Sequence, residues 1–137
     1  MILLGQSQTV ADWVAQRGGK PFHPPFEAIG IIGAAGALTG GLVFTGYNGD
    51  GIEVSVAGHG IASRSAWRAT VDYVFGQLRC KRLAMHTRRS NKIVRHILPR
   101  FGMTFEGVAR RFYGNEDALV FSLTADEVPA FRARWRL

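Results

Sequence analysis

The chain has 137 residues, of which 47% are hydrophobic, so one domain with its own core is expected over residues 1–137. One cysteine excludes an internal disulfide and a cysteine-based zinc site, and no metal site is expected. No apolar run approaches the ~20 residues that cross a bilayer, so a cytoplasmic chain without a membrane partner is expected. The formal net charge of +7 indicates an anionic partner or a solvated basic surface.

The first third of the chain predicts a short helix followed by antiparallel strands. Thr9 and Asp12 have the spacing of a capping box, so a helix is expected over residues 8–17. The proline-rich stretch 20–25 is expected to link this helix to the sheet. The expected strands, joined by tight turns at 35–36 and 48–51, cover residues 28–34, 38–47 and 52–57.

A strand, a glycine turn and a long amphipathic helix follow one another over residues 52–77. The residues at 52, 54 and 56 are apolar and alternate with polar or small residues, and glycines at 58 and 60 end the strand. Ser63 is placed to cap the next helix. The free N–H groups and the positive dipole end of such a helix form an anion site, most naturally for a phosphate.

The second half of the chain predicts further strands and helices. These are a strand over 82–87, a helix from Ser90 or Asn91 to Gly102 with its last turn loosened by Pro99, strands over 104–113 and 118–123, and a final helix capped by Thr124 and Glu127. The strand over 82–87 should run parallel to the strand over 52–57, because a full helix separates them. Phe131 and Trp135 are the expected apolar contacts of the final helix.

Two groups of residues resemble motifs of the GNAT (GCN5-related N-acetyltransferase) superfamily. The stretch Gly58-His59-Gly60-Ile61-Ala62-Ser63 resembles its pyrophosphate loop, with Ser55 at the usual position of an Arg or Gln. A second set resembles the NxxSxxLxxKxGFxxEGxxR signature of the branch that acetylates protein N-termini, including ribosomal ones: Asn91, Gly102, Met103, Glu106, Gly107 and Arg110. The compact form resembles small phage and prophage members of the superfamily.

The resemblance implies an α/β (α+β) GNAT fold. That fold has a central mixed, mostly antiparallel sheet of about six to seven strands, flanked by about three to four helices. Two parallel strands in its middle splay apart and hold acyl-CoA between them. Here these are the strands expected over 52–57 and 82–87.

The resemblance also implies an acetyl-CoA-dependent N-acetyltransferase, in which a primary amine attacks the thioester directly. Glu53, on the strand face opposite Ile52, is the expected base, and His86 is expected near the thioester as a second catalytic residue. The acid stays unassigned among the tyrosines, since Leu98 replaces the usual one. The residues expected to bind coenzyme A are Val56, Ala57, Gly58, His59, Gly60, Ile61, Ala62, Ser63, Arg64 and Asn91, with Arg68, Arg88 and Arg89 as further phosphate contacts.

The acceptor and the partners stay open at this point. A protein N-terminus, a lysine, a small amine and an aminoacyl-tRNA all fit the resemblance. Ser55 and Leu98 favour an alternative, a GNAT-fold structural or interaction protein without turnover. The charge of +7 favours a basic nucleic-acid-binding module. GNAT domains often pair, so a homodimer is expected, with Phe131 and Trp135 as the first contacts to examine.

Overall fold

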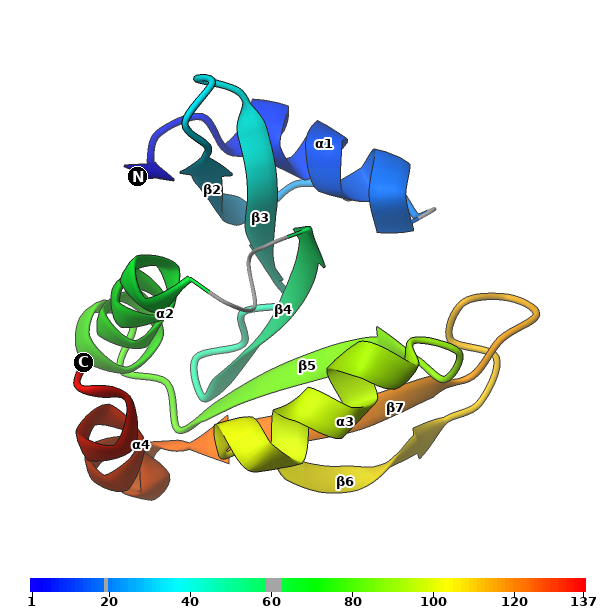
Figure 1. Cartoon of the computed structure of the whole chain (residues 1–137). Helices are drawn as coiled ribbons and strands as arrows, with labels where there is room; N and C mark the ends of the chain where they lie inside the picture. The colour runs from blue at the N-terminus through cyan, green and yellow to red at the C-terminus, as the bar shows by residue number, and fades with distance from the viewer. Residues whose placement is uncertain (19, 59–62) are drawn as a thin grey trace.

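The computed structural model describes residues 1–18, 20–58 and 63–137, apart from the side chain of residue 93. The described residues form a mixed sheet in the order β1-β2-β3-β4-β5-β7-β6 (Figure 1). Its strands are β1 (Ile2–Leu3), β2 (Glu27–Ile32), β3 (Leu38–Thr45), β4 (Gly51–Gly58), β5 (Arg82–Arg88), β6 (Thr104–Ala109) and β7 (Ala118–Thr124). The helices are α1 (Ser7–Gly18), α2 (Arg64–Val71), the π-helix η2 (Asp72–Gln77), α3 (Lys92–Phe101), the 3-10 turn η3 (Ala125–Glu127) and α4 (Val128–Trp135).

Helices cover both faces of the sheet, because alternate residues of each strand point to opposite faces. On one face, Val10 and Val14 of α1 pack against Ala28 and Val43 in a small apolar cluster. On the other face, the larger core contains Leu42 of β3 together with buried residues of α2, α3 and α4. The predicted fold class and the parallel pair of strands in the middle of the sheet are confirmed.

Short-range capping contacts set the helix ends that the sequence predicted. The Ser63 hydroxyl accepts a hydrogen bond from the Ala66 N–H at 3.2 Å and so begins α2. The Asn91 side chain accepts one from the Val94 N–H, also at 3.2 Å, and begins α3. Both contacts of the capping box between Thr124 and Glu127 are present.

Three expectations about the elements need correction, and one strand was not predicted. Helix α1 begins at Ser7, so Thr9 lies inside it and does not cap it. Strand β6 ends at Ala109, because residues 110–113 turn toward β5 instead of continuing the strand. The end of the helix that starts at residue 64 is π-helical, a form that helical spacing alone does not distinguish. Strand β1 was not predicted, since two residues are too few to show a period.

The parallel strands β4 and β5 separate halfway along their length. Their pairing runs from Gly51 opposite Arg82 to Val54 opposite Met85 and ends there, although β4 continues to Gly58. Strand β5 instead keeps its antiparallel partner β7 up to Arg88. The sheet therefore opens between its two halves, as Figure 1 shows, in agreement with the expected splay.

The aromatic residues of α4 belong to the core. Phe131 is 3% exposed and packs against Trp67 and Phe101. The Trp135 indole N–H donates a hydrogen bond to the Phe101 carbonyl at 2.7 Å. Phe131 is therefore not exposed to a second copy, whereas Trp135 is half-buried, and the homodimer stays a prediction. None of the helices that the structure describes is long and apolar enough to span a bilayer.

Candidate active site

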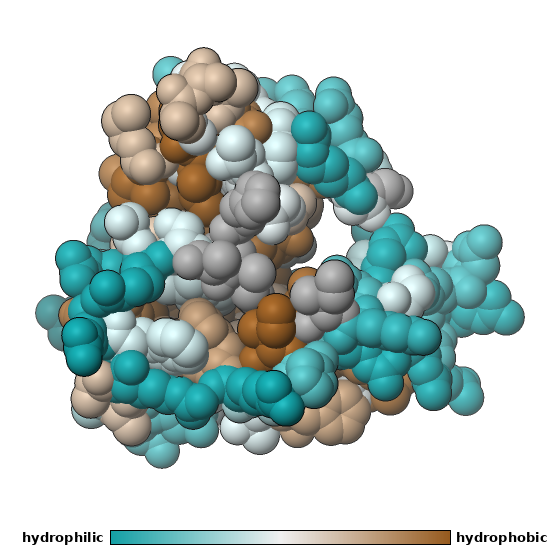
Figure 2. Space-filling model, viewed as in Figure 1, coloured by the Kyte–Doolittle hydropathy of each residue, from teal (hydrophilic) through white to brown (hydrophobic). Residues whose placement is uncertain are grey.

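A cavity of about 480 Å³ lies where β4 and β5 separate. Figure 2 shows the hollow between the half of the molecule that contains α1 and the half that contains α3. Its walls come from six parts of the chain, which are Thr45 of β3, residues 53 and 55–58 of β4, residues 85–88 of β5, the end of α1 with residues 20–23, the start of α3, and residues 112–113. Three strands and two helix ends thus meet around one space.

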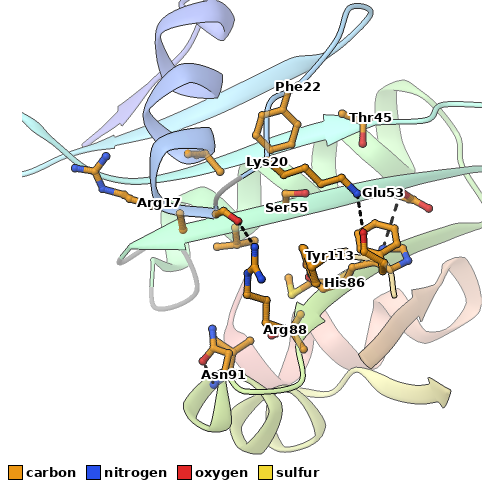
Figure 3. A pocket seen from close by; sticks show the side chains of 18 of the residues that line it. Arg17, Lys20, Phe22, Thr45, Glu53, Ser55, His86, Arg88, Asn91 and Tyr113 are labelled. Carbon is orange, nitrogen blue, oxygen red and sulfur yellow. Dashed lines mark hydrogen bonds and ion pairs between the residues drawn. The ribbon is translucent and has the colours of Figure 1, made fainter. Parts of the chain in front are cut away.

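Glu53 and His86 lie next to each other on one side of this cavity. Glu53 pairs in register with Ala84, so the side chain of His86, two residues farther along β5, points to the same face of the sheet. The His86 Nδ1 atom lies 4.0 Å from Oε2 of Glu53. Both residues line the cavity, as the sequence predicted for a site on the central strands (Figure 3).

His86 is held by an aromatic neighbour and is largely buried. Its ring stacks on Phe112 with 4.3 Å between ring centroids and 7° between ring planes. Burial is the main cause that lowers the pKa of His86, and the positive charges of Lys20 and Arg82 add to it, while the Glu53 carboxylate opposes the shift. The imidazole is therefore neutral near pH 7 and has a nitrogen that accepts a proton.

Tyr113 is the tyrosine that lines the cavity. Its hydroxyl donates a hydrogen bond to the His86 carbonyl at 3.3 Å, and the Arg88 guanidinium lies 4.3 Å from the centre of its ring. Burial raises the pKa of Tyr113 most, against the opposing effect of Arg88, so the phenol is protonated at neutral pH. Tyr47 and Tyr73, the other two candidates for an acid, lie outside the cavity lining.

Two basic side chains connect the end of α1 and the segment after it to the opposite wall of the cavity. The Lys20 ammonium donates a hydrogen bond to the Phe112 carbonyl at 2.8 Å and lies 4.2 Å from the centre of the Phe112 ring. The Arg88 guanidinium donates to the Gly18 carbonyl at 2.7 Å and pairs with Glu116 at 3.1 Å. In Figure 3 the dashed line from Lys20 lies beside Glu53 and His86, and the line from Arg88 runs to the end of α1.

The residues expected at coenzyme A lie in several places. Val56, Ala57, Gly58 and Asn91 line the cavity, and Asn91 also caps α3. The backbone of β4 beyond Val54 has no ladder partner on β5 within the described residues, which leaves polar groups available to an amide-containing ligand. The expected residues His59, Gly60, Ile61 and Ala62 lie outside the described part of the chain.

The basic residues at the start of α2 contact the C-terminal end of α4. Arg64 donates hydrogen bonds to the carbonyls of Trp135 and Arg136, at 3.2 and 3.1 Å. Arg68 donates to the same Arg136 carbonyl at 3.2 Å. Both guanidiniums therefore have a role in the fold, and their contact with a phosphate stays a prediction. The first turn of α2 contains no acidic residue, which keeps its positive end free of a competing carboxylate.

Sequence reasoning missed the segment that follows α1 as part of the site. Residues 20–23 were expected to be a linker, and Phe112 was expected to continue a strand, yet both line the cavity. The bond between Lys20 and Phe112 joins positions 92 residues apart, so no local pattern announces it. The aromatic pair at 112–113, directly before a Gly-Asn turn, was expected to end a strand and gave no sign of the loop that folds over His86.

Comparison of the sequence with protein-family models finds no match, and comparison with curated proteins finds none either. Solved structures, by contrast, are similar. A candidate acetyltransferase from T. thermophilus has a TM-score of 0.73 at 20% identity over 83% of this chain and 66% of its own. A GCN5-related N-acetyltransferase from Brucella melitensis gives 0.67 at 26% identity, over 80% and 56% of the two chains.

The spermidine/spermine N-acetyltransferase SpeG from Vibrio cholerae gives a TM-score of 0.64 at 17% identity, over 77% of this chain and 68% of its own. The chain thus spans about two thirds or less of the T. thermophilus and Brucella proteins, at 66% and 56% of their lengths. In this chain the fold consists of a mixed sheet with the parallel pair β4 and β5 and helices on both faces. The chain has the fold of the GCN5-related N-acetyltransferases.

Proposed function

We propose that this protein is an acetyl-CoA-dependent N-acetyltransferase that moves an acetyl group to a primary amine. The observation that carries the proposal is the cavity at the separation of β4 and β5, with Glu53 and a neutral His86 on one side. The solved structures with this fold that we compared are acetyltransferases by description. The chemistry of the lining residues agrees with that activity.

The half of β4 beyond Val54 and the start of α3 would hold acetyl-CoA. The unpaired backbone along residues 55–58 suits the amides of the pantetheine arm, and the Asn91 side chain lies at the same wall. The start of α2, with Ser63 as its cap, suits the pyrophosphate. When bound there, acetyl-CoA supplies an acyl group already activated as a thioester.

Glu53 and His86 would take the proton that the acceptor must lose. A primary ammonium with a pKa near ~10 is almost fully charged at neutral pH and has no lone pair to attack with. The neutral imidazole accepts a proton, and the carboxylate 4.0 Å away stabilises the resulting imidazolium. As the N–C bond forms, the C–S bond would break, the nitrogen would lose its second proton, and the leaving thiolate would take up one. Tyr113, protonated and in the cavity, would supply the proton of the thiolate and take back the one that the nitrogen loses.

Glu106, part of the sequence motif in β6, stabilises the fold and gives no information about the acceptor. Both Arg82 NH groups donate to the Glu106 carboxylate at 2.9 Å, and the Ser122 hydroxyl donates to it at the same distance. Hydrogen bonds from Arg82 are the main cause that lowers the pKa of Glu106. This carboxylate therefore joins β5, β7 and β6, and a place in the branch that acetylates protein N-termini rests on the sequence motif alone.

Basic residues are grouped at 79–82, 110–111 and 132–136 of the sequence, and these basic runs give less support to a nucleic-acid-binding module. Arg82 pairs with Glu106 and Arg132 pairs with Asp72 at 2.6 Å, so neither is a free charge for a phosphate. Cys80, inside one of these runs, is 2% exposed. Acetyl transfer is therefore the better supported function, and nucleic-acid binding is the second candidate.

An assay of amine-dependent release of the coenzyme A thiol tests the proposal. Wild-type protein should release thiol from acetyl-CoA faster when a primary amine is present, with the acetylated amine found by mass spectrometry. Glu53→Gln and His86→Gln should each lower kcat by about a hundredfold, a typical contribution of general base catalysis. Glu27→Gln makes the same substitution on β2, outside the cavity lining, and should leave kcat unchanged. Equal rates in all four proteins would exclude Glu53 and His86 as the base.

A further inference from the structure

The charged residues around the cavity are mostly cations. Apart from histidines, those lining it are Arg17, Lys20, Arg88 and Glu53. Glu53 is the one carboxylate among the described lining residues, and the proposed function already uses it as part of the base. An acceptor with additional positive charges would therefore meet cations and no further carboxylate at this wall.

Lys20 is the cation best placed to meet an acceptor. Arg17 stacks on Trp13 at 3.5 Å and points away from the group around His86 in Figure 3. Arg88 already has a carboxylate partner in Glu116 at 3.1 Å. Lys20 has no carboxylate within salt-bridge distance among the residues that the structure describes.

The Lys20 ammonium also lies beside the place where the amine would lose its proton. It is 4.2 Å from the centre of the Phe112 ring, and the same ring stacks on His86 at 4.3 Å. The structure gives the ammonium one hydrogen bond, to the Phe112 carbonyl, although an ammonium has three protons to donate. One acceptor molecule could therefore bind Lys20 through an anionic group and place its amine, a few bonds away, next to Glu53 and His86.

We propose that the acceptor is a primary amine that carries an anionic group close to the amine, a carboxylate or a phosphate, and that Lys20 binds this group. The inference rests on the proposed function and adds the substrate class to it. The amine faces Glu53 and His86, and the anion displaces solvent from Lys20, where it forms a charge-assisted hydrogen bond. A polyamine is excluded as the preferred acceptor, because Lys20 repels its second ammonium.

Matched pairs of acceptors test this inference. The carboxylate arm compares common amino acids with the amines that remain when the carboxyl group is removed. The phosphate arm compares O-phosphoethanolamine with ethanolamine, and spermidine serves as the polyamine. In the pairs that react, the anionic member should have a kcat/KM about tenfold to a hundredfold higher, as expected for a hydrogen bond between charged groups. A preference for the uncharged members or for spermidine would overturn the inference.

Variants of Lys20 identify the residue responsible. Lys20→Gln should remove the preference within each pair, and Lys20→Glu should reverse it, both mainly through KM. Lys81→Glu, the same charge change at an exposed position directly before β5, should preserve it. If Lys20→Gln slows both members of each pair equally, Lys20 only ties the chain segments together, and the inference is wrong.

A binding experiment keeps the inference separate from the proposed function. Ligand-observed NMR in the presence of coenzyme A measures acceptor binding without turnover. If no acceptor is acetylated but the anionic members bind in a way that depends on Lys20, the proposed catalysis fails and the binding preference stands. If no anionic member binds to the folded protein, the inference is overturned whatever the catalytic result.

Discussion

Gly58 ends β4 at the rim of the cavity, and the structure allows only glycine there. Its φ of +65° lies in the left-handed region. A Cβ at this position would lie 2.3 Å from the Thr39 carbonyl oxygen and 2.8 Å from a ring carbon of Trp13. Because the first contact is with backbone, a rotamer change cannot relieve it, and β3 and β4 would have to move apart. Gly46 has a similar φ of +68° and nothing within 4 Å of an added Cβ.

These two glycines separate backbone strain from steric overlap. A residue with a Cβ in the left-handed region costs about 1–2 kcal/mol, which applies to both Gly46→Ala and Gly58→Ala. Overpacking adds about 1–3 kcal/mol at Gly58 alone, for a total of about 2–5 kcal/mol. The gain from a stiffer unfolded chain is common to both variants and cancels in the comparison.

Urea denaturation followed by circular dichroism measures both changes in the free energy of unfolding. Gly58→Ala should be destabilised by about 1–3 kcal/mol more than Gly46→Ala, at an unchanged m-value. Gly58→Ala should also weaken acetyl-CoA binding, because the strand edge that lines the cavity moves. Equal losses of stability in the two variants would refute the steric argument and with it the described end of β4.

The remaining predictions concern the proton relay and the capping box. In an NMR titration, Lys20→Gln should raise the pKa of His86, because the ammonium lowers it, and Glu53→Gln should lower that pKa further, because the carboxylate opposes the shift. The acid limb of kcat/KM should move in the same directions, and opposite movements would contradict the assignment of His86. Thr124→Ala should reduce the free energy of unfolding by about 1 kcal/mol through loss of the capping contact that its hydroxyl makes, while the backbone N–H of residue 124 keeps its contact with Glu127, and an unchanged urea midpoint would contradict that role.

The parts of the fold that the sequence predicts depend on contacts between near neighbours. Ser63 and Asn91 each accept a hydrogen bond from an N–H three residues later, so residue type and spacing identify them. The period of two along β4 places Glu53 on the face opposite Ile52, and this was enough to bring it to the cavity. The parallel direction of β5 follows from the length of the connection alone.

The parts that the sequence does not predict depend on distant contacts. The alternation from residue 104 continues past Ala109, but Arg111 takes a φ of +58°, and its N–H donates to Asp117 at 2.9 Å. That turn folds Phe112 over His86, so the segment between β6 and β7 contacts β5. Lys20 reaches the same place from the segment after α1. The part of the proposed acceptor site formed by Lys20 and Phe112 therefore arises only when the segment after α1 meets the turn between β6 and β7.

Calorimetric titration of the folded protein with acetyl-CoA tests most directly whether the space between β4 and β5 is a cofactor site. Val94 lines the cavity from α3, and Ile97 lies on the same helix outside the lining; both are half-buried. Wild-type protein and Ile97→Trp should bind acetyl-CoA, whereas Val94→Trp should lose binding because the larger ring fills the cavity. Folded wild-type protein that does not bind acetyl-CoA at low salt, or Val94→Trp that binds as well as wild type, would contradict this account.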